Sequence, residues 1–218
     1  MPLLEVKDLY KSFGNVKVLN GINLTLEPGK IYTLRGDNGS GKTTLLNILS
    51  GFMMPDRGSV QFNGQELVGM KPHAISRLGI KRTFQDLRII RDMTLAENIQ
   101  LSLDSNSIIS KKQKNRIDEV LEFLHMGQYR DVRASYLSYG QLKLLTLGCA
   151  IVDTSSLLLL DEPSSGLGVQ SISYVLSLEK KMKGDGKTIL QVEHDLDFID
   201  ETSDKVFTLE KGQLHVVR

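Results

Sequence analysis

The sequence predicts an α/β fold with a mainly parallel sheet, an antiparallel accessory sheet and a helical lobe. Three observations support this class. Strand-like and helix-like segments alternate on both sides of a central region. The four consecutive leucines at residues 157–160 indicate a strand that is buried on both faces, as in parallel sheets. Strand patterns are missing from about residue 86 to residue 136, which predicts a helical insert.

The first part of the chain alternates in the β manner before a helix begins. Apolar residues recur at every second position in segments 3–9 and 22–26, and Pro28-Gly29 marks a turn. Residues 31–35 predict a short buried strand, followed by a glycine-rich loop and a helix over 42–49 that Gly51 ends. Residues 59–62 predict a strand that enters a hairpin at Asn63-Gly64.

The rest of the chain predicts a helical lobe and then a return to alternating strands and helices. We expect an apolar helix over 142–151, a strand over 157–160, a helix over 169–183, a strand over 188–192 and a terminal hairpin formed by 205–210 and 213–217. One face of a further helix carries Ile117, Val120, Leu121 and Leu124. We therefore predict a single domain, with 1–85 and 155–218 as the catalytic core with a β-subdomain and 86–154 as an α-helical subdomain.

Composition narrows the class of protein. The 218 residues suffice for one sizeable core, and 27 basic against 26 acidic residues argue against a nucleic-acid binder. The single cysteine, Cys149, cannot form an internal disulfide, which favours a reducing compartment. No apolar run approaches the ~20 residues of a spanning helix, and no signal peptide is recognisable. We expect a cytoplasmic protein that meets a membrane only through other chains.

A phosphate-binding loop lies between the predicted strand 31–35 and the predicted helix 42–49. Its small residues let backbone N–H groups surround phosphate oxygens, and the helix directs its positive end at them. Lys42 supplies a cation for the β- and γ-phosphates, and Thr43 offers a hydroxyl to Mg²⁺. The residues expected to contact the nucleotide are Gly36, Asp37, Asn38, Gly39, Ser40, Gly41, Lys42, Thr43 and Thr44.

Two acids, Asp161 and Glu162, directly follow the leucine strand. The carboxyl end of such a strand lies beside the phosphate loop in this architecture. We expect Asp161 to hold Mg²⁺ and Glu162 to orient and deprotonate the attacking water. A free glutamate is ionised at neutral pH, so it can accept that proton.

Further motifs carry a resemblance to a known family. Leu137-Ser138-Tyr139-Gly140-Gln141 resembles the Leu-Ser-Gly-Gly-Gln signature of ABC ATPases. Gln85 resembles the glutamine of the family's Q-loop, and His194 resembles its switch histidine. Phe13 lies where the family places an aromatic ring against adenine, with Val18 nearby. The resemblance covers the whole chain and implies a P-loop NTPase core.

The resemblance also implies a mechanism and partners. Two ATPase subunits, identical or not, face each other head-to-tail, and each ATP lies between one phosphate loop and the opposite signature. The catalytic residues would be Lys42, Glu162 and His194, and Gln85 would join Thr43 and Asp161 at the metal. The cofactors would be ATP and Mg²⁺, and the partners would be transmembrane permease subunits and, for an importer, a substrate-binding protein. The opposite ATP would meet Ser138, Tyr139, Gly140 and Gln141.

The branch of the family is indicated by segments 79–85 and 91–98, which are similar to ATPases of branched-chain amino acid and urea importers. An exporter subunit and a soluble ABC ATPase of the cluster-assembly type are the alternatives. The chain also departs from the family pattern. Leu144 and Cys149 stand at two arginine positions, and Gly168 stands where many relatives have aspartate or asparagine bridging the two sites.

Overall fold

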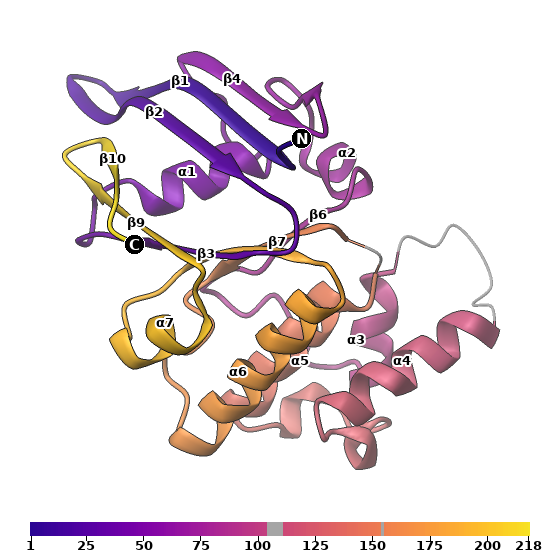
Figure 1. The fold of residues 1–218 in the computed structure, drawn as a ribbon. Coiled ribbons are helices and arrows are strands. Elements are labelled where there is room, and N and C mark those ends of the chain that lie inside the picture. The colour runs from indigo at the N-terminus through magenta and orange to yellow at the C-terminus, as the bar shows by residue number, and fades with distance from the viewer. Residues whose placement is uncertain (104–110, 154) are drawn as a thin grey trace.

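The computed structural model describes residues 1–103, 111–153 and 155–218. In this part of the chain a four-stranded sheet lies above a six-stranded sheet, and helix α1 (Lys42–Leu49) lies between them (Figure 1). Most of the other helices cover the opposite face of the larger sheet. The predicted fold class is confirmed.

The smaller sheet is antiparallel, with the order β2-β1-β4-β5. Its strands are β1 (Leu4–Phe13), β2 (Val16–Leu26), β4 (Arg57–Phe62) and β5 (Gln65–Glu66). The first two are longer than the alternating segments predict. Register shifts after Val6, Leu9 and Lys11 break the alternation while the pairing continues, which hides the outer halves from a pattern search.

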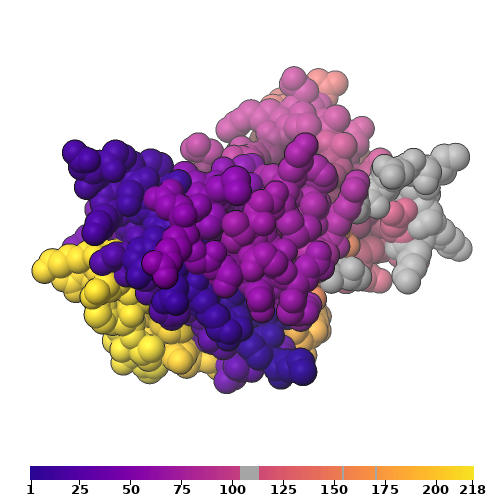
Figure 2. Space-filling model, turned by 90° about the horizontal axis from the view of Figure 1, so that it is seen from above, coloured from indigo at the N-terminus to yellow at the C-terminus, as the bar shows by residue number. Residues whose placement is uncertain are grey.

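The larger sheet has the order β10-β9-β3-β8-β7-β6. All neighbouring pairs are parallel except the terminal hairpin of β9 and β10, which is antiparallel. Figure 2 shows this hairpin beside the N-terminal strands, where the Asn20 N–H donates to the Gly212 carbonyl. The strands are β3 (Ile31–Arg35), β6 (Ile80–Arg82), β7 (Leu157–Asp161), β8 (Thr188–Val192), β9 (Lys205–Glu210) and β10 (Gln213–Val216).

The helices after α1 are α2 (Pro72–Arg77), α3 (Leu95–Leu101), α4 (Lys111–Phe123), α5 (Tyr139–Ile151), α6 (Val169–Gly184) and α7 (Leu196–Thr202), with short 3₁₀ turns at Gly127–Tyr129 and Ala134–Tyr136. The predicted apolar face of α4 is buried. The pattern missed α2, α3, α7 and the short strand β6, because each offers too few turns or alternations to detect.

The predicted helical subdomain, residues 86–154, contains α3, α4 and α5. Residues 104–110 and 154 of that range lie outside the described part of the chain. Helix α5 starts at Tyr139, earlier than the predicted 142, because Ser138 caps it. The division into subdomains stays a prediction.

Strand β7 connects the two halves of the core. Leu157 and Leu159 pack in the cluster that contains α1 and the antiparallel sheet. Leu158 and Leu160 point to the other face, into the cluster formed by α3, α4, α5 and α6. The strand is therefore buried on both faces, as its composition predicts, and its carboxyl end delivers Asp161 to the edge of the sheet.

One carboxyl group lies inside the core. Glu179 of α6 is 0% exposed and faces the Gln191 side chain of β8. Burial raises the pKa of the Glu179 carboxyl well above its usual range, and the charge of Glu193 raises it further. Glu179 therefore binds its proton more tightly in the folded protein than in the unfolded chain, and ionising it opposes folding.

Glu179→Gln should increase stability at pH 8 more than at pH 5. The unfolded carboxyl releases its proton near pH ~4.3 whereas the folded one retains it, so folding of the natural protein weakens as pH rises above that value. A pKa raised by one unit corresponds to about 1.4 kcal/mol once the pH exceeds both values. Urea unfolding at the two pH values measures the difference, with the exposed Glu119→Gln as control. Equal pH slopes for the natural protein and Glu179→Gln would contradict the assignment.

Candidate functional site

A cavity of about 420 Å³ opens above the phosphate loop, at the carboxyl ends of β7 and β8. Residues from distant parts of the chain meet there, because parallel strands end at the same edge of the sheet. Its lining contains most of the predicted nucleotide and metal residues: Val18, Asn38, Gly39, Gly41, Lys42, Thr43, Thr44, Gln85, Asp161 and Glu162, with Val192 in addition.

The phosphate loop is shaped by close backbone contacts. Gly36 has a φ of 146°, and a Cβ added there would lie 2.3 Å from the Leu209 carbonyl oxygen of β9. Only glycine fits this crossing. Gly41 caps α1 without a side-chain hydrogen bond, so the N-cap residue leaves the first N–H groups of the helix open. These groups are a ready binding site for anions.

Two residues of this loop, Lys42 and Ser40, have buried polar atoms. The Lys42 Nζ donates to the carbonyls of Gly36 at 2.6 Å and of Asp37 at 2.9 Å. Burial lowers the pKa of Lys42, and the carboxylates of Glu162, Asp37 and Asp161 oppose that effect. The Ser40 Oγ is buried without a hydrogen-bond partner in the described residues. A buried cation and an unpartnered hydroxyl beside helix N–H groups fit the phosphates of a nucleotide.

Glu162 lies between Gln85, which the resemblance assigns to the metal, and His194, which it assigns to catalysis. Its carboxylate accepts a hydrogen bond from Gln85 Nε2 at 3.4 Å and lies 3.6 Å from His194 Nε2. The Glu162 backbone has a φ of 51°, a left-handed conformation that costs a non-glycine residue free energy. Its N–H donates to the Val192 carbonyl of β8 at 3.0 Å, which holds this conformation. The carboxylate thus lies between an amide and an imidazole.

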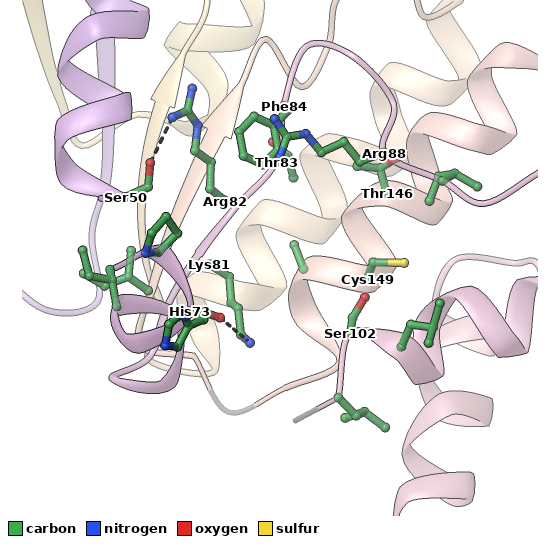
Figure 3. Close-up of a pocket in the computed structure, with 18 of the residues that line it drawn as sticks. Ser50, His73, Lys81, Arg82, Thr83, Phe84, Arg88, Ser102, Thr146 and Cys149 are labelled. Atoms are coloured by element: carbon green, nitrogen blue, oxygen red, sulfur yellow. Dashed lines mark hydrogen bonds between the residues drawn. The ribbon is translucent and has the colours of Figure 1, made fainter. Parts of the chain in front are cut away.

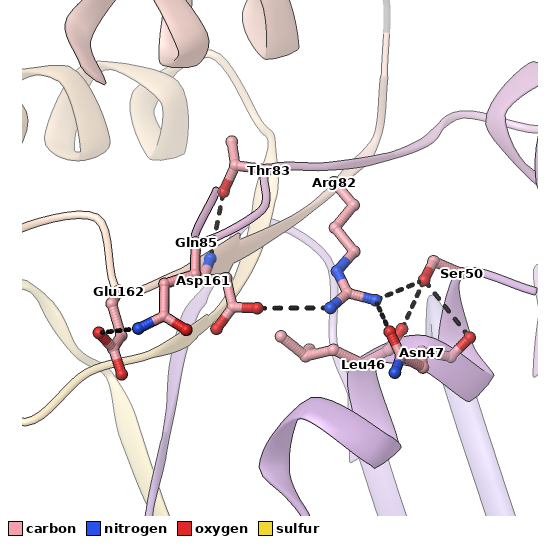
Figure 4. Close-up of polar contacts among 8 residues, drawn as sticks. All are labelled: Leu46, Asn47, Ser50, Arg82, Thr83, Gln85, Asp161 and Glu162. Atoms are coloured by element: carbon pink, nitrogen blue, oxygen red, sulfur yellow. Dashed lines mark hydrogen bonds and ion pairs between the residues drawn. The ribbon is translucent and has the colours of Figure 1, made fainter. Parts of the chain in front are cut away.

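Asp161 is held by residues that the sequence analysis did not name as site residues. Arg82 of β6 contacts Asp161 Oδ2 at 3.3 Å and donates to Asn47 Oδ1 at 2.7 Å and Ser50 Oγ at 3.0 Å (Figure 4). The Asp161 N–H donates to Thr83 Oγ1 at 3.1 Å. The guanidinium therefore ties the end of α1 to the carboxylate. The sequence offered no usable signal for Arg82, because this arginine ends β6, a short strand that the pattern missed.

The donors that line the cavity suit Mg²⁺. Thr43, Gln85 and Asp161 would supply a hydroxyl, an amide and a carboxylate oxygen, which are the hard oxygen ligands that this ion prefers. When bound, Mg²⁺ would neutralise charge on the phosphate oxygens.

The signature residues and Phe13 lie apart from this cavity. Ser138 Oγ accepts the Gln141 N–H at 3.3 Å and Gln141 Oε1 accepts the Ser138 N–H at 2.9 Å, which forms a capping box at the start of α5. None of the signature residues is among the described residues that line the cavity. Phe13 is 48% exposed at the end of β1. Their predicted contacts with nucleotide stay predictions.

The three residues that depart from the family pattern have simple surroundings. Leu144 lies inside the helical core cluster and Cys149 packs against it. Burial raises the pKa of the Cys149 thiol to about 11, so the thiol is unreactive at neutral pH. Gly168 caps α6 without a side-chain hydrogen bond. Apolar residues at 144 and 149 fit a helix that is buried on most sides, where an arginine would need a partner.

A second cavity, of about 510 Å³, lies between α2 and β6 on one side and α3 and α5 on the other (Figure 3). We call it the Phe84 groove. The Arg88 guanidinium stacks on the Phe84 ring at 3.3 Å, and Phe52 meets that ring edge-on at 5.3 Å. Exposed Ile90 and Leu101 add apolar surface. No aspartate or glutamate is among the described residues that line the groove, so the groove is apolar and basic.

Comparison with known proteins gives consistent results. The profile of the ABC transporter family matches residues 19–165. The chain is 36% identical to the probable branched-chain amino acid transport ATP-binding protein LivG of Archaeoglobus fulgidus, over 98% of this chain and 88% of that protein. It is 33% identical to the xylose/arabinose import ATP-binding protein XylG of Sulfolobus acidocaldarius, over 97% and 86%.

Among solved structures, the chain is similar to a nucleotide-free ATP-binding cassette from an ABC transporter. The TM-score is 0.91 at 28% identity, and the match covers 100% of this chain and 92% of that one. The similarity therefore extends over the antiparallel sheet, the parallel sheet and the helices alike.

Arg82→Met should weaken folding by about 3–5 kcal/mol, because it leaves the buried Asp161 without its counter-charge. Arg82→Lys should cost less, since an ammonium keeps the charge but cannot reach Asp161 and α1 together. In urea unfolding, Arg82→Met combined with Asp161→Asn should lose less than the sum of the two single changes. Arg88→Met in the Phe84 groove is the control and should cost about 1 kcal/mol or less. Additive losses would show that the ion pair does not hold Asp161.

Proposed function

The chain belongs to the ABC transporter family and is an ATP-binding, ATP-hydrolysing subunit, and we propose that it acts as one half of a head-to-tail pair. Each ATP would lie between the phosphate loop of one copy and Ser138 of the other. One observation carries the proposal: the cavity gathers Lys42, Asp161 and Glu162, while the capped start of α5 lies outside it. A second copy would bring that helix end to the γ-phosphate.

The start of α5 has the chemistry for this role. The N–H groups of its first turn form the positive end of a helix, and the Ser138 hydroxyl is exposed beside them. Large apolar side chains are exposed nearby, at Tyr136, Tyr139 and Val169. Closing the pair would bury these side chains and complete the coordination of the nucleotide.

Hydrolysis would follow from the geometry around Glu162. Lys42 and the loop N–H groups would bind the β- and γ-phosphates, and Mg²⁺ would neutralise the charge that develops on them. Glu162 would accept a proton from water, whose oxygen attacks the γ-phosphorus as the bond to ADP breaks. His194 and Gln85, which flank the carboxylate, would hold that water and the γ-phosphate in line. Phe13 and Val18 would contact adenine.

We further propose that the Phe84 groove docks a cytoplasmic helix of a permease subunit. The described residues of this chain contain no helix that is long and apolar enough to cross a membrane. The groove offers aromatic and aliphatic surface rimmed by arginine and lacks acidic side chains among its described residues. The fitting partner is an amphipathic helix with an apolar face and acidic residues at its edge.

The leading substrate class is a small polar solute that is imported, with a branched-chain amino acid first. The Archaeoglobus relative is named for branched-chain amino acid transport and the Sulfolobus relative for import of xylose and arabinose. An exporter subunit and a soluble ABC ATPase of the cluster-assembly type are the alternatives. Permeases isolated together with a substrate-binding protein would favour import.

Glu162→Gln should abolish ATP turnover while ATP still binds, and it should accumulate as a dimer with ATP. Adding Ser138→Arg should prevent that dimer yet leave ATP affinity near normal, because Ser138 lies outside the chain's own cavity. Light scattering and equilibrium ATP binding measure both properties.

The matched control for this experiment is Ser177→Arg, the same substitution at an exposed serine of α6. It should leave the ATP-dependent dimer intact. Ordinary turnover by Glu162→Gln, or dimers that survive Ser138→Arg, would contradict the proposed arrangement.

Arg88→Glu should abolish co-purification with permease subunits from native membranes, because it reverses the charge stacked on Phe84. The ATPase rate of the isolated subunit should change less than twofold, since Arg88 lies outside the nucleotide cavity. Arg91→Glu, at an exposed arginine that is not among the described groove residues, is the control. Equal capture of the permease by all three proteins would rule out an acidic partner helix in this groove.

A further inference from the structure

Two buried groups of opposite charge hold the loop that follows Glu162. We call residues 163–168 the post-Glu loop. Lys143 reaches it from α5, and Glu193 reaches it from the segment after β8. The Lys143 Nζ donates to the Ser165 carbonyl, and the Ser164 N–H donates to Glu193 Oε2 at 3.1 Å. The loop backbone is thus gripped at neighbouring residues from two elements.

Lys143 is deeply placed for a lysine, with 8% of its surface exposed. Burial lowers its pKa, while the carboxylates of Glu193, Glu162 and Asp161 act in the opposite direction. A buried ammonium group costs free energy unless it is paired and hydrogen-bonded. The Lys143 ammonium contacts the loop carbonyl, and the charges of the carboxylates at the catalytic edge favour its protonated form.

Glu193 is 2% exposed and connects the post-Glu loop to the switch histidine. Besides the Ser164 N–H, its carboxylate accepts the N–H of His194 at 2.8 Å and of Asp195 at 3.3 Å. A shift of the loop relative to β8 would therefore disturb the backbone that presents His194.

A third contact joins the post-Glu loop to the signature itself. A Cβ added at Gly166 would lie 2.9 Å from Tyr139 Cε1, and the Gly166 φ of 74° is one that other residues rarely adopt. The tyrosine ring therefore lies directly over the loop backbone. Helix α5 therefore touches the loop twice, through Tyr139 in its first turn and through Lys143 one turn later.

We propose that Lys143 is a positioning residue that couples the signature to hydrolysis within one subunit. When the start of α5 binds the opposite ATP, Lys143 keeps the post-Glu loop at a constant position relative to α5. The loop in turn determines the position of Glu162 directly and the position of His194 through Glu193. Gly168 has no side chain with which to anchor this loop, so side chains outside the loop, with Lys143 of α5 among them, anchor it. The inference rests on the proposed head-to-tail pair.

The test is Lys143→Met, a change of similar volume that removes the ammonium group. Glu193 keeps its three backbone donors, so we expect the protein to fold. The kcat for ATP should fall about 10- to 100-fold, as for a misplaced catalytic group, with a KM change below about threefold. Lys143→Arg should recover most of the kcat, because it can still donate to the Ser165 carbonyl. Lys180→Met, at an exposed lysine of α6, is the control and should match the natural protein.

Gly166→Ala tests the same coupling from the loop side, should Lys143→Met fail to fold. Its methyl group would displace the loop from Tyr139, so kcat should fall while KM holds. An unchanged kcat in Lys143→Met, or equal losses in kcat, ATP affinity and thermal stability, would overturn the inference. ATP-dependent dimers should still form when Lys143→Met is added to Glu162→Gln. If Glu162→Gln alone does not dimerise with ATP, the proposed pair fails, whatever Lys143 does.

Discussion

Burial of β7 on both faces is the constraint on which the rest of the site depends. Leu157 and Leu159 pack toward α1 and the antiparallel sheet, and the alternate leucines pack toward the helices. Sliding the strand by one residue would draw Asp161 into the apolar core or push Leu160 out of it, so burial on both faces fixes its register. Asp161 and Glu162 therefore lie at a fixed position at the edge of the sheet, between β6 and β8, where residues from both neighbouring strands contact them. A rigid apolar scaffold is what permits charged groups to be placed with precision at its edge.

Charged side chains around that edge contact the two catalytic-site acids or the backbone beside them. Arg82 ties Asp161 to the end of the phosphate-loop helix, and Lys143 and Glu193 grip the backbone after Glu162. Each is buried, and a buried charge is worth keeping only where pairing offsets the loss of hydration. All three contact catalytic or adjacent backbone groups, and none serves the apolar core alone. These charged side chains connect α1, α5 and the switch segment to one carboxylate pair.

Much of the fold and of the nucleotide cavity could be predicted from the sequence, because local patterns encode them. The phosphate loop, the leucine strand and the acids after it are contiguous motifs whose chemistry requires their order. The residues that the sequence analysis missed act across the chain. Arg82 reaches Asp161 only because β6 and β7 pair, and Lys143 reaches the post-Glu loop only because α5 packs beside it. No spacing rule links such positions. The bulged pairing of β1 with β2 and the short helices were hidden for a related reason, since tertiary contacts stabilise them.

The central claim is that one nucleotide is completed by two chains. A structure of the Glu162→Gln protein with Mg²⁺ and ATP tests it most directly. The account predicts two ATP molecules in a two-fold pair, each with its phosphates on Lys42 and Thr43 of one chain and its γ-phosphate at Ser138 of the other. A pair in which Ser138 approaches the nucleotide of its own chain, or one in which it contacts no nucleotide, would contradict the account.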